Sequence, residues 1–295
     1  MPQRLLTLHT LSPLHCGTGQ GVAGIDLPIQ RERHTGWPVI PGSSIKGVLR
    51  DAYRCSLGLN PKDADKDKRT IALFGPAPQE ELGLGALILG DAFLVAFPVR
   101  SLCGVFAWVT CPLAIHRLQR LQLGSPAWTP PLDLTDATVY GPQALVAHGD
   151  QVVLEDHALQ RVNAIAPEIL ALLKQRWVPS AVPLLESHLA VVSDTIFTWF
   201  ARHATQVEAR IALDPATKTV NDGQLFYEET VPPEAVFIAP VMAEHARHPE
   251  AAPELRQADK ALAALGGVVQ GKTLQFGGKA TIGRGQCALH LPEGN

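Results

Sequence analysis

The chain has 295 residues, of which 46% are hydrophobic and 18% charged, and its formal net charge is −3 at pH 7. These are the proportions of a globular protein. A chain of this length buries about 75% of its unfolded surface, which allows a sizeable core in one large or two small domains. No apolar run reaches the roughly 18 to 20 residues of a membrane span, and the N-terminal MPQRLLTLHTLSP lacks a signal-peptide pattern.

The charges are unevenly distributed along the chain. Residues 1–54 hold six basic side chains against three acids, namely Arg4, Arg31, Arg33, Lys46, Arg50 and Arg54 against Asp26, Glu32 and Asp51. Residues 266–292 hold Lys272, Lys279 and Arg284 and no acid. Because distribution matters more than the sum for binding an anionic partner, the two basic ends are the features to follow.

The five cysteines stand at positions 16, 55, 103, 111 and 287, without a C-x-x-C pair. This pattern is typical of the reducing cytosol and argues against a zinc ribbon. We therefore expect a cytoplasmic protein.

A glycine-rich loop follows the first predicted strand, Arg4–Leu11. Gly19–Gly24 reads G-x-G-x-x-G, which is the spacing of a dinucleotide-binding turn. That turn needs a helix directly after the glycines, but Pro28 disfavours helix at Leu27. We therefore expect a flexible loop whose backbone approaches a ligand closely.

A helix is predicted after Pro41-Gly42, with Ser43 or Ser44 as its N-cap. Its apolar residues have the spacing of a buried stripe: Ile45, Val48, Leu49, Ala52 and Tyr53. The opposite face carries a basic row, Lys46, Arg50 and Arg54. This pattern fits an ordinary surface helix, but free N–H groups and the helix dipole also favour a phosphate or carboxylate at the N-terminus.

Residues 58–84 are charged and proline-rich, and we expect a mobile insertion of poor order. Strands are predicted for Gly85–Val99, broken at Gly90-Asp91, and for Gly104–Thr110, followed by a helix from Pro112 to Leu123. Residues 125–185 are interpreted as an inserted helical subdomain, with a helix near Pro167–Trp177.

Further strands are predicted for Leu189–Phe200, Glu208–Leu213 and Gln224–Val231. The Asn-Asp-Gly signal at 221–223 makes the last two a long hairpin within 205–232. A helix is predicted for Pro253–Leu265, with Gly266-Gly267 as its glycine C-cap.

Five motifs in this order carry a family resemblance: HCGTGQGVAGIDLPIQRE, PGSSIKGVLR, GDAFLVAFPVRS with GVFAWVTCP, ARIALDPATKTVNDGQLFYEE and FGGKATIGRG. They resemble the RAMP superfamily, and within it the target-RNA-cleaving backbone subunits of type III-B (Cmr) CRISPR–Cas effector complexes, which serve antiviral defence. The motifs span nearly the whole chain.

The resemblance implies an α+β fold: a single RAMP domain over residues 1–295 with a ferredoxin-like, RNA-recognition-motif-like core. It implies that the hairpin at 205–232 is a thumb reaching a neighbouring subunit and wedging between nucleotides. The implied partners are a guide RNA, a single-stranded target RNA, copies of the chain itself in a filament and other Cmr subunits. The implied activity is divalent-metal-dependent target RNA cleavage at regular intervals, with Mg²⁺ or Mn²⁺ as the metal.

Asp26 matches the loop aspartate that this family requires for cleavage. Attack by a ribose 2′-OH needs a base and charge neutralisation at the phosphate. Asp26 is the candidate base or metal ligand, and Arg31 and Arg33 are candidates for neutralisation. His15 is a candidate for proton transfer, with a structural role as the alternative. Without the resemblance, Asp26 is interpreted as a capping carboxylate.

The same resemblance makes Phe276–Gly285 the glycine-rich loop of the family. Together with the helix start, this loop would form a groove for an RNA backbone, and a plain hairpin turn is the alternative. The predicted RNA-binding residues are Gly42, Ser43, Ser44, Lys46, Arg50, Arg31, Arg33, Lys279 and Arg284.

Two other functions stay open. A non-cleaving backbone subunit of a related CRISPR effector would bind RNA without cutting it. A stand-alone guide-processing endoribonuclease would cut precursor RNA without partners, and would normally use a histidine-centred acid and base.

Overall fold

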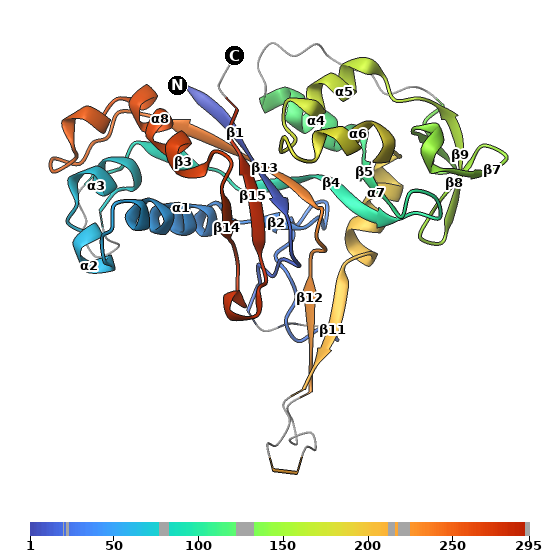
Figure 1. The fold of residues 1–295 in the computed structure, drawn as a ribbon, viewed down its shortest axis with the longest axis horizontal. Helices are drawn as coiled ribbons and strands as arrows, with labels where there is room; N and C mark the ends of the chain where they lie inside the picture. Colours follow the sequence, from blue (N-terminus) through green and yellow to red (C-terminus); the bar gives the residue numbers. More distant parts are fainter. Residues whose placement is uncertain are drawn as a thin grey trace.

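The computed structural model describes residues 1–19, 21, 24–76, 83–121, 133–211, 216–217 and 225–292. Within them the chain combines eight α-helices with a thirteen-stranded mixed β-sheet, which confirms the α+β class (Figure 1). Two further strands, β11 (Gln206–Arg210) and β12 (Phe226–Thr230), pair with each other and project from the body. None of the described helices is long and apolar enough to cross a membrane.

The strands of the large sheet are β1 (Gln3–Thr10), β2 (Val39–Ile40), β3 (Leu87–Leu89), β4 (Ala92–Arg100), β5 (Phe106–Thr110), β6 (Thr138–Tyr140), β7 (Val146–His148), β8 (Gln151–Leu154), β9 (His157–Asn163), β10 (Leu189–Val191), β13 (Val236–Ala243), β14 (Thr273–Gln275) and β15 (Gln286–His290). The α-helices are α1 (Gly42–Ser56), α2 (Pro61–Ala64), α3 (Lys68–Phe74), α4 (Pro112–Leu121), α5 (Pro167–Lys174), α6 (Val182–His188), α7 (Asp194–His203) and α8 (Ala258–Val269). Short 3-10 helices are η1 (Gln143–Leu145), η2 (Pro253–Leu255) and η3 (Ala280–Ile282).

The central strands are buried on both faces of the sheet. In β13, Phe237 and Val241 belong to the apolar cluster that includes α1 and α8, whereas Val236 and Ile238 belong to the cluster that includes α4, α5 and α6. A strand covered on both faces has no polar side. This explains why β4 reads as the nearly continuous apolar run AFLVAFPVR.

Two similar units make up the middle of the fold. Strand β1 leads through α1 to β4, and β13 leads through α8 to β15. The four strands lie in the order β15-β1-β13-β4, and all neighbours are antiparallel. Because β1 pairs with β15, and α1 contacts both α8 and β14, the first and last segments of the chain lie side by side (Figure 1).

Several predicted elements are confirmed. Strand β1 matches the predicted strand Arg4–Leu11, and β3 and β4 are separated at Gly90-Asp91 as expected. Strand β5 and helices α4 and α5 also lie within their predicted ranges. In each of these elements the local pattern of apolar residues and breakers agrees with the burial in the fold.

Helix α1 has the predicted apolar stripe, with Ile45 and Leu49 fully buried and Tyr53 8% exposed. Its predicted serine cap is wrong. The N-cap residue is Pro41, and no side chain of the cap residue bonds to the helix.

The start of α1 is instead capped from the connection between β3 and β4. Asp91 Oδ1 accepts a hydrogen bond from Gly42 N at 2.7 Å. The antiparallel pairing of Ile40 with Ala92 brings Asp91 to this position. The cap comes from a residue 49 positions away, so the local sequence of the helix does not reveal it.

The expectation of poor order in residues 58–84 is wrong for most of the segment, because α2 and α3 form there. Asn60 caps α2 and Asp67 caps α3 through side-chain oxygens that accept backbone N–H bonds. The apolar residues of α3 are buried, including Ile71 and Phe74. Residues 77–82 lie outside the described residues.

The prediction of a helical subdomain at 125–185 is also wrong in its described part, which begins at residue 133. Besides α5 and α6, it contains β6 to β9, and β6 pairs with β10 so that these strands extend the main sheet. These strands are short and partly exposed, and β9 reads HALQRVN with polar residues at most exposed positions. Such a pattern gives little strand signal in sequence.

Two boundaries differ from expectation for identifiable reasons. The predicted strand Leu189–Phe200 ends at Val191, and α7 begins because Ser193 Oγ accepts a hydrogen bond from Ile196 N at 3.2 Å. Helix α8 does not end at Gly266-Gly267 but continues to Val269. Strands β11 and β12 form the predicted hairpin stem, while residues 212–215 and 218–224 of that hairpin lie outside the described residues.

The packing of α1 generates a stability prediction. Replacing the fully buried Leu49 by Ala should lower the free energy of unfolding by about 2–5 kcal/mol, because it removes apolar contacts and leaves a cavity. Leu184→Ala on α6, where the side chain is 48% exposed, is the matched control and should change it by no more than about 0.5 kcal/mol. Urea denaturation of both variants measures the difference, and equal effects would contradict the assigned core.

Candidate functional site

The segment that carries Asp26 is fastened along β12. Isolated bridges pair Leu14 with Val231 and Leu27 with Glu228, and a further bridge joins Gly17 to Ile29 across the segment itself. These contacts make a narrow loop whose two sides are held and whose tip contains the glycines. Gln20, Val22 and Ala23 of that tip lie outside the described residues.

The Asp26 carboxylate is exposed at the point where the loop returns to β12. Its Oδ2 accepts a hydrogen bond from Tyr227 N at 2.7 Å, and its backbone carbonyl accepts one from Gly21 N at 2.8 Å. It forms no ion pair with any residue that the structure describes. One carboxylate oxygen is therefore oriented by the protein and the other is available to a ligand.

His15 is buried, with 7% exposure, and bridges two other parts of the site. Its Nδ1 donates to Glu229 O at 2.8 Å, so Nδ1 carries a proton. Its carbonyl accepts a hydrogen bond from Gly278 N at 2.9 Å in the glycine-rich loop. Gly17 leaves room for the ring, since a Cβ there would lie 2.6 Å from Nε2. This environment is that of a structural histidine.

Glu229 holds the Asp26 loop from inside. Its Oε1 accepts hydrogen bonds from Arg31 Nη2 at 2.5 Å and Thr205 Oγ1 at 2.8 Å, and its Oε2 accepts one from Ile29 N at 3.1 Å. Arg31 also donates through Nη1 to two backbone carbonyls, those of Gly36 and Ala201. The guanidinium group of Arg31 is thus bound to protein oxygens, which differs from its expected role of neutralising a phosphate.

A second ion pair holds the far end of the loop. Glu32 accepts hydrogen bonds from Arg117 of α4, at 2.9 Å from Nη1 and 2.5 Å from Nη2. Burial of the carboxyl raises its pKa, but the bonds from Arg117 and Thr35 outweigh this, so the pKa of Glu32 is lowered. Arg33, which directly follows the ion-paired Arg31 and Glu32, is exposed and pairs with no described residue.

Two N–H groups at the start of α1 have no partner among the described residues. Gly42 N is occupied by Asp91, whereas the N–H groups of Ser43 and Ser44 bond to no described residue. Gly42 itself packs tightly, because a Cβ there would lie 2.5 Å from Leu89 O. The free N–H groups are therefore those of the second and third helical residues, which suit an anion.

Only part of the basic row of α1 is available to bind an anionic ligand. Lys46 is exposed. The pKa of its ammonium group is lowered, mainly by partial desolvation and also by the nearby positive charge of Arg50. Arg50 donates to Gly75 O at 2.7 Å and to Asp65 Oδ1 at 3.0 Å. Arg50 therefore fastens α2 and the end of α3, which differs from its predicted role in binding RNA.

The glycine-rich loop has the conformation that its glycines allow. Gly277 and Gly285 have φ values of 73° and 75°, and a Cβ on them would lie 2.2 Å from His15 O and 1.9 Å from Phe276 O. Lys279 is exposed, with φ 64°, and its Nζ lies 5.5 Å from the centre of the Phe226 ring on β12. The loop is thus packed on His15 and against the hairpin stem.

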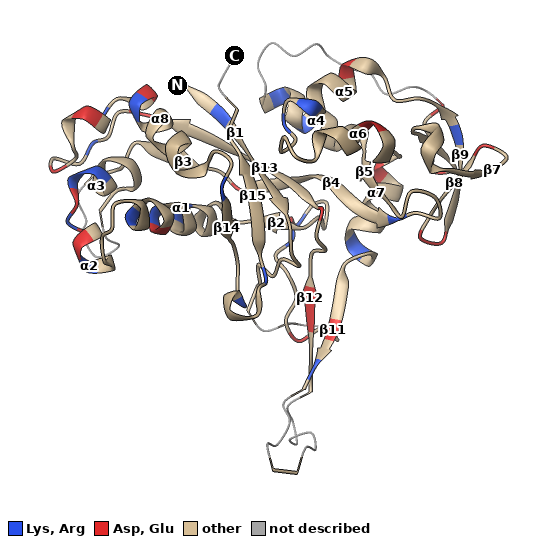
Figure 2. Cartoon of the chain, in the orientation of Figure 1, with Lys and Arg blue, Asp and Glu red and all other residues tan. Residues whose placement is uncertain are grey.

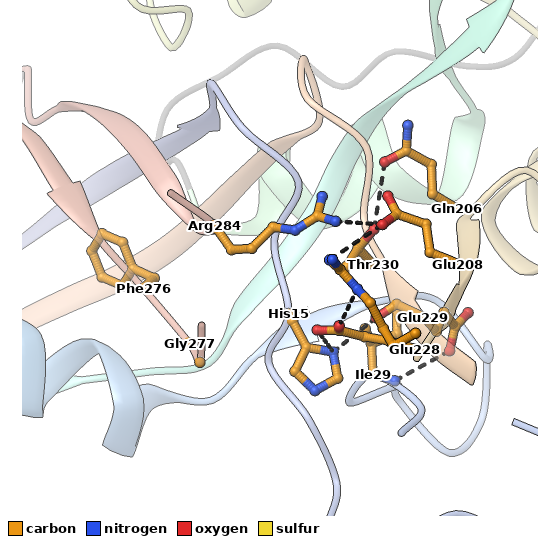
Figure 3. Close-up of polar contacts among 12 residues, drawn as sticks. His15, Ile29, Gln206, Glu208, Glu228, Glu229, Thr230, Phe276, Gly277 and Arg284 are labelled. Atoms are coloured by element: carbon orange, nitrogen blue, oxygen red, sulfur yellow. Dashed lines mark hydrogen bonds and ion pairs between the residues drawn. The ribbon is translucent and has the colours of Figure 1, made fainter. Parts of the chain in front are cut away.

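Charged side chains of the hairpin stem meet the glycine-rich loop (Figure 3). Arg284 Nη2 donates to Glu208 Oε2 at 2.6 Å, so this predicted RNA ligand also has a protein partner. On the neighbouring strand, Glu228 is 1% exposed and accepts a hydrogen bond from Arg210 Nε at 3.2 Å. Sequence reasoning missed these acids. The consecutive Glu228 and Glu229 were the available signal, because neighbouring residues of a strand face opposite sides and at least one of the two must point inward at the hairpin root.

Basic residues from both ends of the chain are visible on α1 and along the segment from β14 to β15 in Figure 2. Strand β14, which leads into the glycine-rich loop, contacts α1. The two basic ends therefore belong to one region of the molecule. In the described residues, no group of three or more His, Cys, Asp and Glu side chains is arranged to hold a metal ion.

Comparisons with known proteins identify the family of the chain. The model of the RAMP superfamily matches residues 7–288. The chain is 33% identical to the CRISPR system Cmr endoribonuclease Cmr4 of Pyrococcus furiosus over 301 aligned residues, which cover 99% of this chain and 97% of that protein. A crystal structure of oligomeric Cmr4 from Pyrococcus furiosus superposes with a TM-score of 0.74 at 29% identity and covers 99% of this chain and 98% of that one.

A chain of the type III-B Cmr-beta complex bound to cognate target RNA has the same fold. Its TM-score is 0.72 at 19% identity, with 99% of this chain and 97% of that chain covered.

The backbone of the glycine-rich loop generates a prediction. Gly285→Ala should lower the free energy of unfolding by at least about 1–3 kcal/mol, because the residue has a positive φ and no space for a Cβ. Gly267→Ala is the control, since Gly267 lies within α8 with open space around it, and should raise it by about 0.4–1 kcal/mol. Thermal denaturation compares them, and a stable Gly285→Ala variant would contradict the described loop.

Proposed function

Because the chain belongs to the RAMP superfamily, we propose that it is a backbone subunit of a type III-B CRISPR effector that binds guide RNA and cleaves complementary target RNA at regular intervals. The likeness to the Pyrococcus Cmr endoribonuclease extends over nearly the full length of both chains. The observation that carries the cleavage proposal is the exposed Asp26 carboxylate, which is oriented by Tyr227 N and keeps one oxygen free.

The proposal includes a ferredoxin-like core with a thumb. The units β1–α1–β4 and β13–α8–β15, in the strand order β15-β1-β13-β4, support the core assignment. The projecting β11–β12 stem supports the thumb at 205–232, which would reach a neighbouring copy. One similar crystal structure is of an oligomeric protein, and another similar chain belongs to a complex bound to target RNA. The proposed partners are therefore further copies of the chain, other Cmr subunits, a guide RNA and a single-stranded target RNA, in the cytoplasm.

The chemistry proposed for Asp26 is removal of the proton from a ribose 2′-OH that attacks the adjacent phosphate. As the 2′-oxygen bonds to phosphorus, the bond from phosphorus to the 5′-oxygen breaks, and that oxygen takes a proton from water. The hydrogen bond from Tyr227 N fixes the carboxylate, and the oxygen that pairs with no described residue would take the proton. In the alternative role, Asp26 would hold a divalent ion, which when bound would neutralise charge on the phosphate. Because the described residues offer no cluster of ligands, RNA oxygens and water would complete its coordination.

His15 is assigned a positioning role in this proposal. Its buried ring connects Glu229 with the glycine-rich loop, and its Nδ1 is occupied. A guide-processing enzyme with a histidine-centred acid and base is therefore less well supported than cleavage through Asp26.

Guide binding is proposed for the free N–H groups of Ser43 and Ser44, together with Lys46, Arg33 and Lys279. These groups are exposed or without protein partners, and they would contact phosphates of a single strand. Arg31 and Arg50 are assigned to the scaffold, because their guanidinium groups already bind protein oxygens.

Asp26→Asn tests the cleavage proposal. The amide oxygen still accepts the bond from Tyr227 N, so we expect guide binding and assembly to be unchanged. Cleavage in a reconstituted complex should fall by at least about 100-fold, the usual contribution of a general base. The readout is the set of products at fixed spacing on a guide-matched target. Asp156→Asn, in the exposed β8–β9 turn, is the control. Unchanged cleavage by Asp26→Asn would contradict the assignment, and a wild-type complex that binds but does not cut would identify a non-cleaving subunit.

Lys46→Gln and Lys279→Gln test the guide site. Each should weaken binding of single-stranded RNA, and each should reduce the magnitude of the log–log salt slope by about 0.7 if one phosphate contact is lost. Lys174→Gln on α5, whose ammonium pairs with Glu186, is the control and should leave the slope unchanged. Fluorescence anisotropy at several salt concentrations measures the slopes. Equal slopes for all three variants would rule out the proposed guide contacts.

A further inference from the structure

Two arginines converge on one carboxylate oxygen where the hairpin stem meets the glycine-rich loop. Glu208 Oε2 lies 2.6 Å from Arg284 Nη2 (Figure 3). The same oxygen lies 3.2 Å from Arg210 Nη2. Glu208 and Arg210 stand on β11, whereas Arg284 comes from the segment just before β15. A single negative charge therefore joins two elements that are distant in the sequence.

The three side chains are not equally fixed. Glu208 is 41% exposed, whereas Arg284 is only 12% exposed. The backbone at Arg284 is held by hydrogen bonds from Arg284 N to Lys279 O at 3.3 Å and from Gly285 N to Pro13 O at 2.9 Å. Glu208 is thus the member of the trio that is free to rotate into solvent, while Arg284 stays in place.

Arg210 is held independently of Glu208. Its Nε donates to Glu228 Oε2 at 3.2 Å, and Glu228 is 1% exposed. Its Nη2 is buried, and although close to Glu208 it is not aligned for a hydrogen bond to any described residue. A buried N–H donor without an aligned acceptor is costly, so this group is suited to an anion that approaches from a different direction.

The surroundings favour a phosphodiester as that anion. Lys279 lies over Phe226 of the same hairpin stem and adds a third positive charge. A phosphodiester carries one negative charge on two oxygens, as the carboxylate does, and arginine forks bind both groups in the same way. The exchange of Glu208 for a phosphodiester therefore keeps both guanidinium groups paired.

We propose that Arg210 and Arg284 form a phosphodiester-binding site that Glu208 fills while no RNA is bound. The inference rests on the proposed RNA-binding function and deepens it, because it adds Arg210 as a ligand and makes Glu208 a competitor of the RNA. It also gives Arg284 two roles, as the partner of Glu208 in the free chain and as a phosphate ligand in the complex. The site adjoins the Asp26 loop. Asp26 accepts a hydrogen bond from Tyr227 N, and the next residue, Glu228, binds Arg210.

Glu208→Gln tests the proposal, because it removes the competing charge and keeps the shape of the side chain. The full chain with this change should bind a single-stranded RNA about fivefold more tightly, the scale of one partly exposed charge pair. Its salt slope should be steeper by about 0.7, as for one added phosphate contact. In the double variant with Arg284→Gln the gain should disappear. Glu186→Gln, an exposed glutamate that pairs with Lys174, is the control and should leave both quantities unchanged.

Two measurements separate the sources of the phosphodiester. Tighter binding of single-stranded RNA by the isolated chain assigns the site to the guide, and tighter binding of target only by the guide-loaded complex assigns it to the target. If Glu208→Gln changes neither, or if its gain persists without Arg284, the inference is overturned while the proposed function stands. Failure of the wild-type chain and complex to bind RNA would overturn both. Melting temperatures confirm that the variants are folded, and Glu208→Asp, which keeps the charge, should bind RNA less tightly than Glu208→Gln.

Discussion

The attachment of the Asp26 loop to β12 is the constraint on which the site depends. A loop rich in glycine loses much conformational entropy when it is ordered, so its position has to be secured by contacts outside itself. Glu229 provides them with one buried carboxylate that binds a side chain and a backbone amide of the loop, while Tyr227 N orients Asp26 directly. The same strand continues into the projecting stem. The geometry of the candidate cleavage site and of the hairpin is therefore set by one short element.

The sequence predicts those parts of the molecule that depend on neighbouring residues. The stripe of α1, the break at Gly90-Asp91 and the stem of the hairpin all follow from local patterns, and the structure contains them. Asp26 and the glycine-rich loop were assigned through resemblance, and their exposure in the structure is compatible with that assignment. Helix boundaries were missed where a single polar side chain decides them, as Ser193 does for α7.

The sequence does not predict which charges are free. Lys46 and Arg50 are one helical turn apart in the same basic row. Within the part of the chain that the structure describes, only Arg50 reaches protein acceptors, and these belong to other segments. Arg31 and Arg284 are likewise paired with glutamates of the hairpin stem that lie 198 and 76 positions away. A count of basic residues therefore overestimates the positive charge available to a ligand, because pairing is decided by tertiary contacts and not by spacing along the chain.

The contact between Gly278 N and His15 O has a consequence for the order in which the molecule is built. The loop holding Asp26 is synthesised early, but β12, which orients it, and the glycine-rich segment, which rests on His15, are synthesised more than 200 residues later. Strand β1 similarly pairs with β13 and β15, which are synthesised near the end of the chain. Such long separations make folding slow and leave an early β-strand without partners on the ribosome. A nascent chain halted before β12 has neither the strand that orients Asp26 nor the glycine-rich loop, so this site forms only late in synthesis.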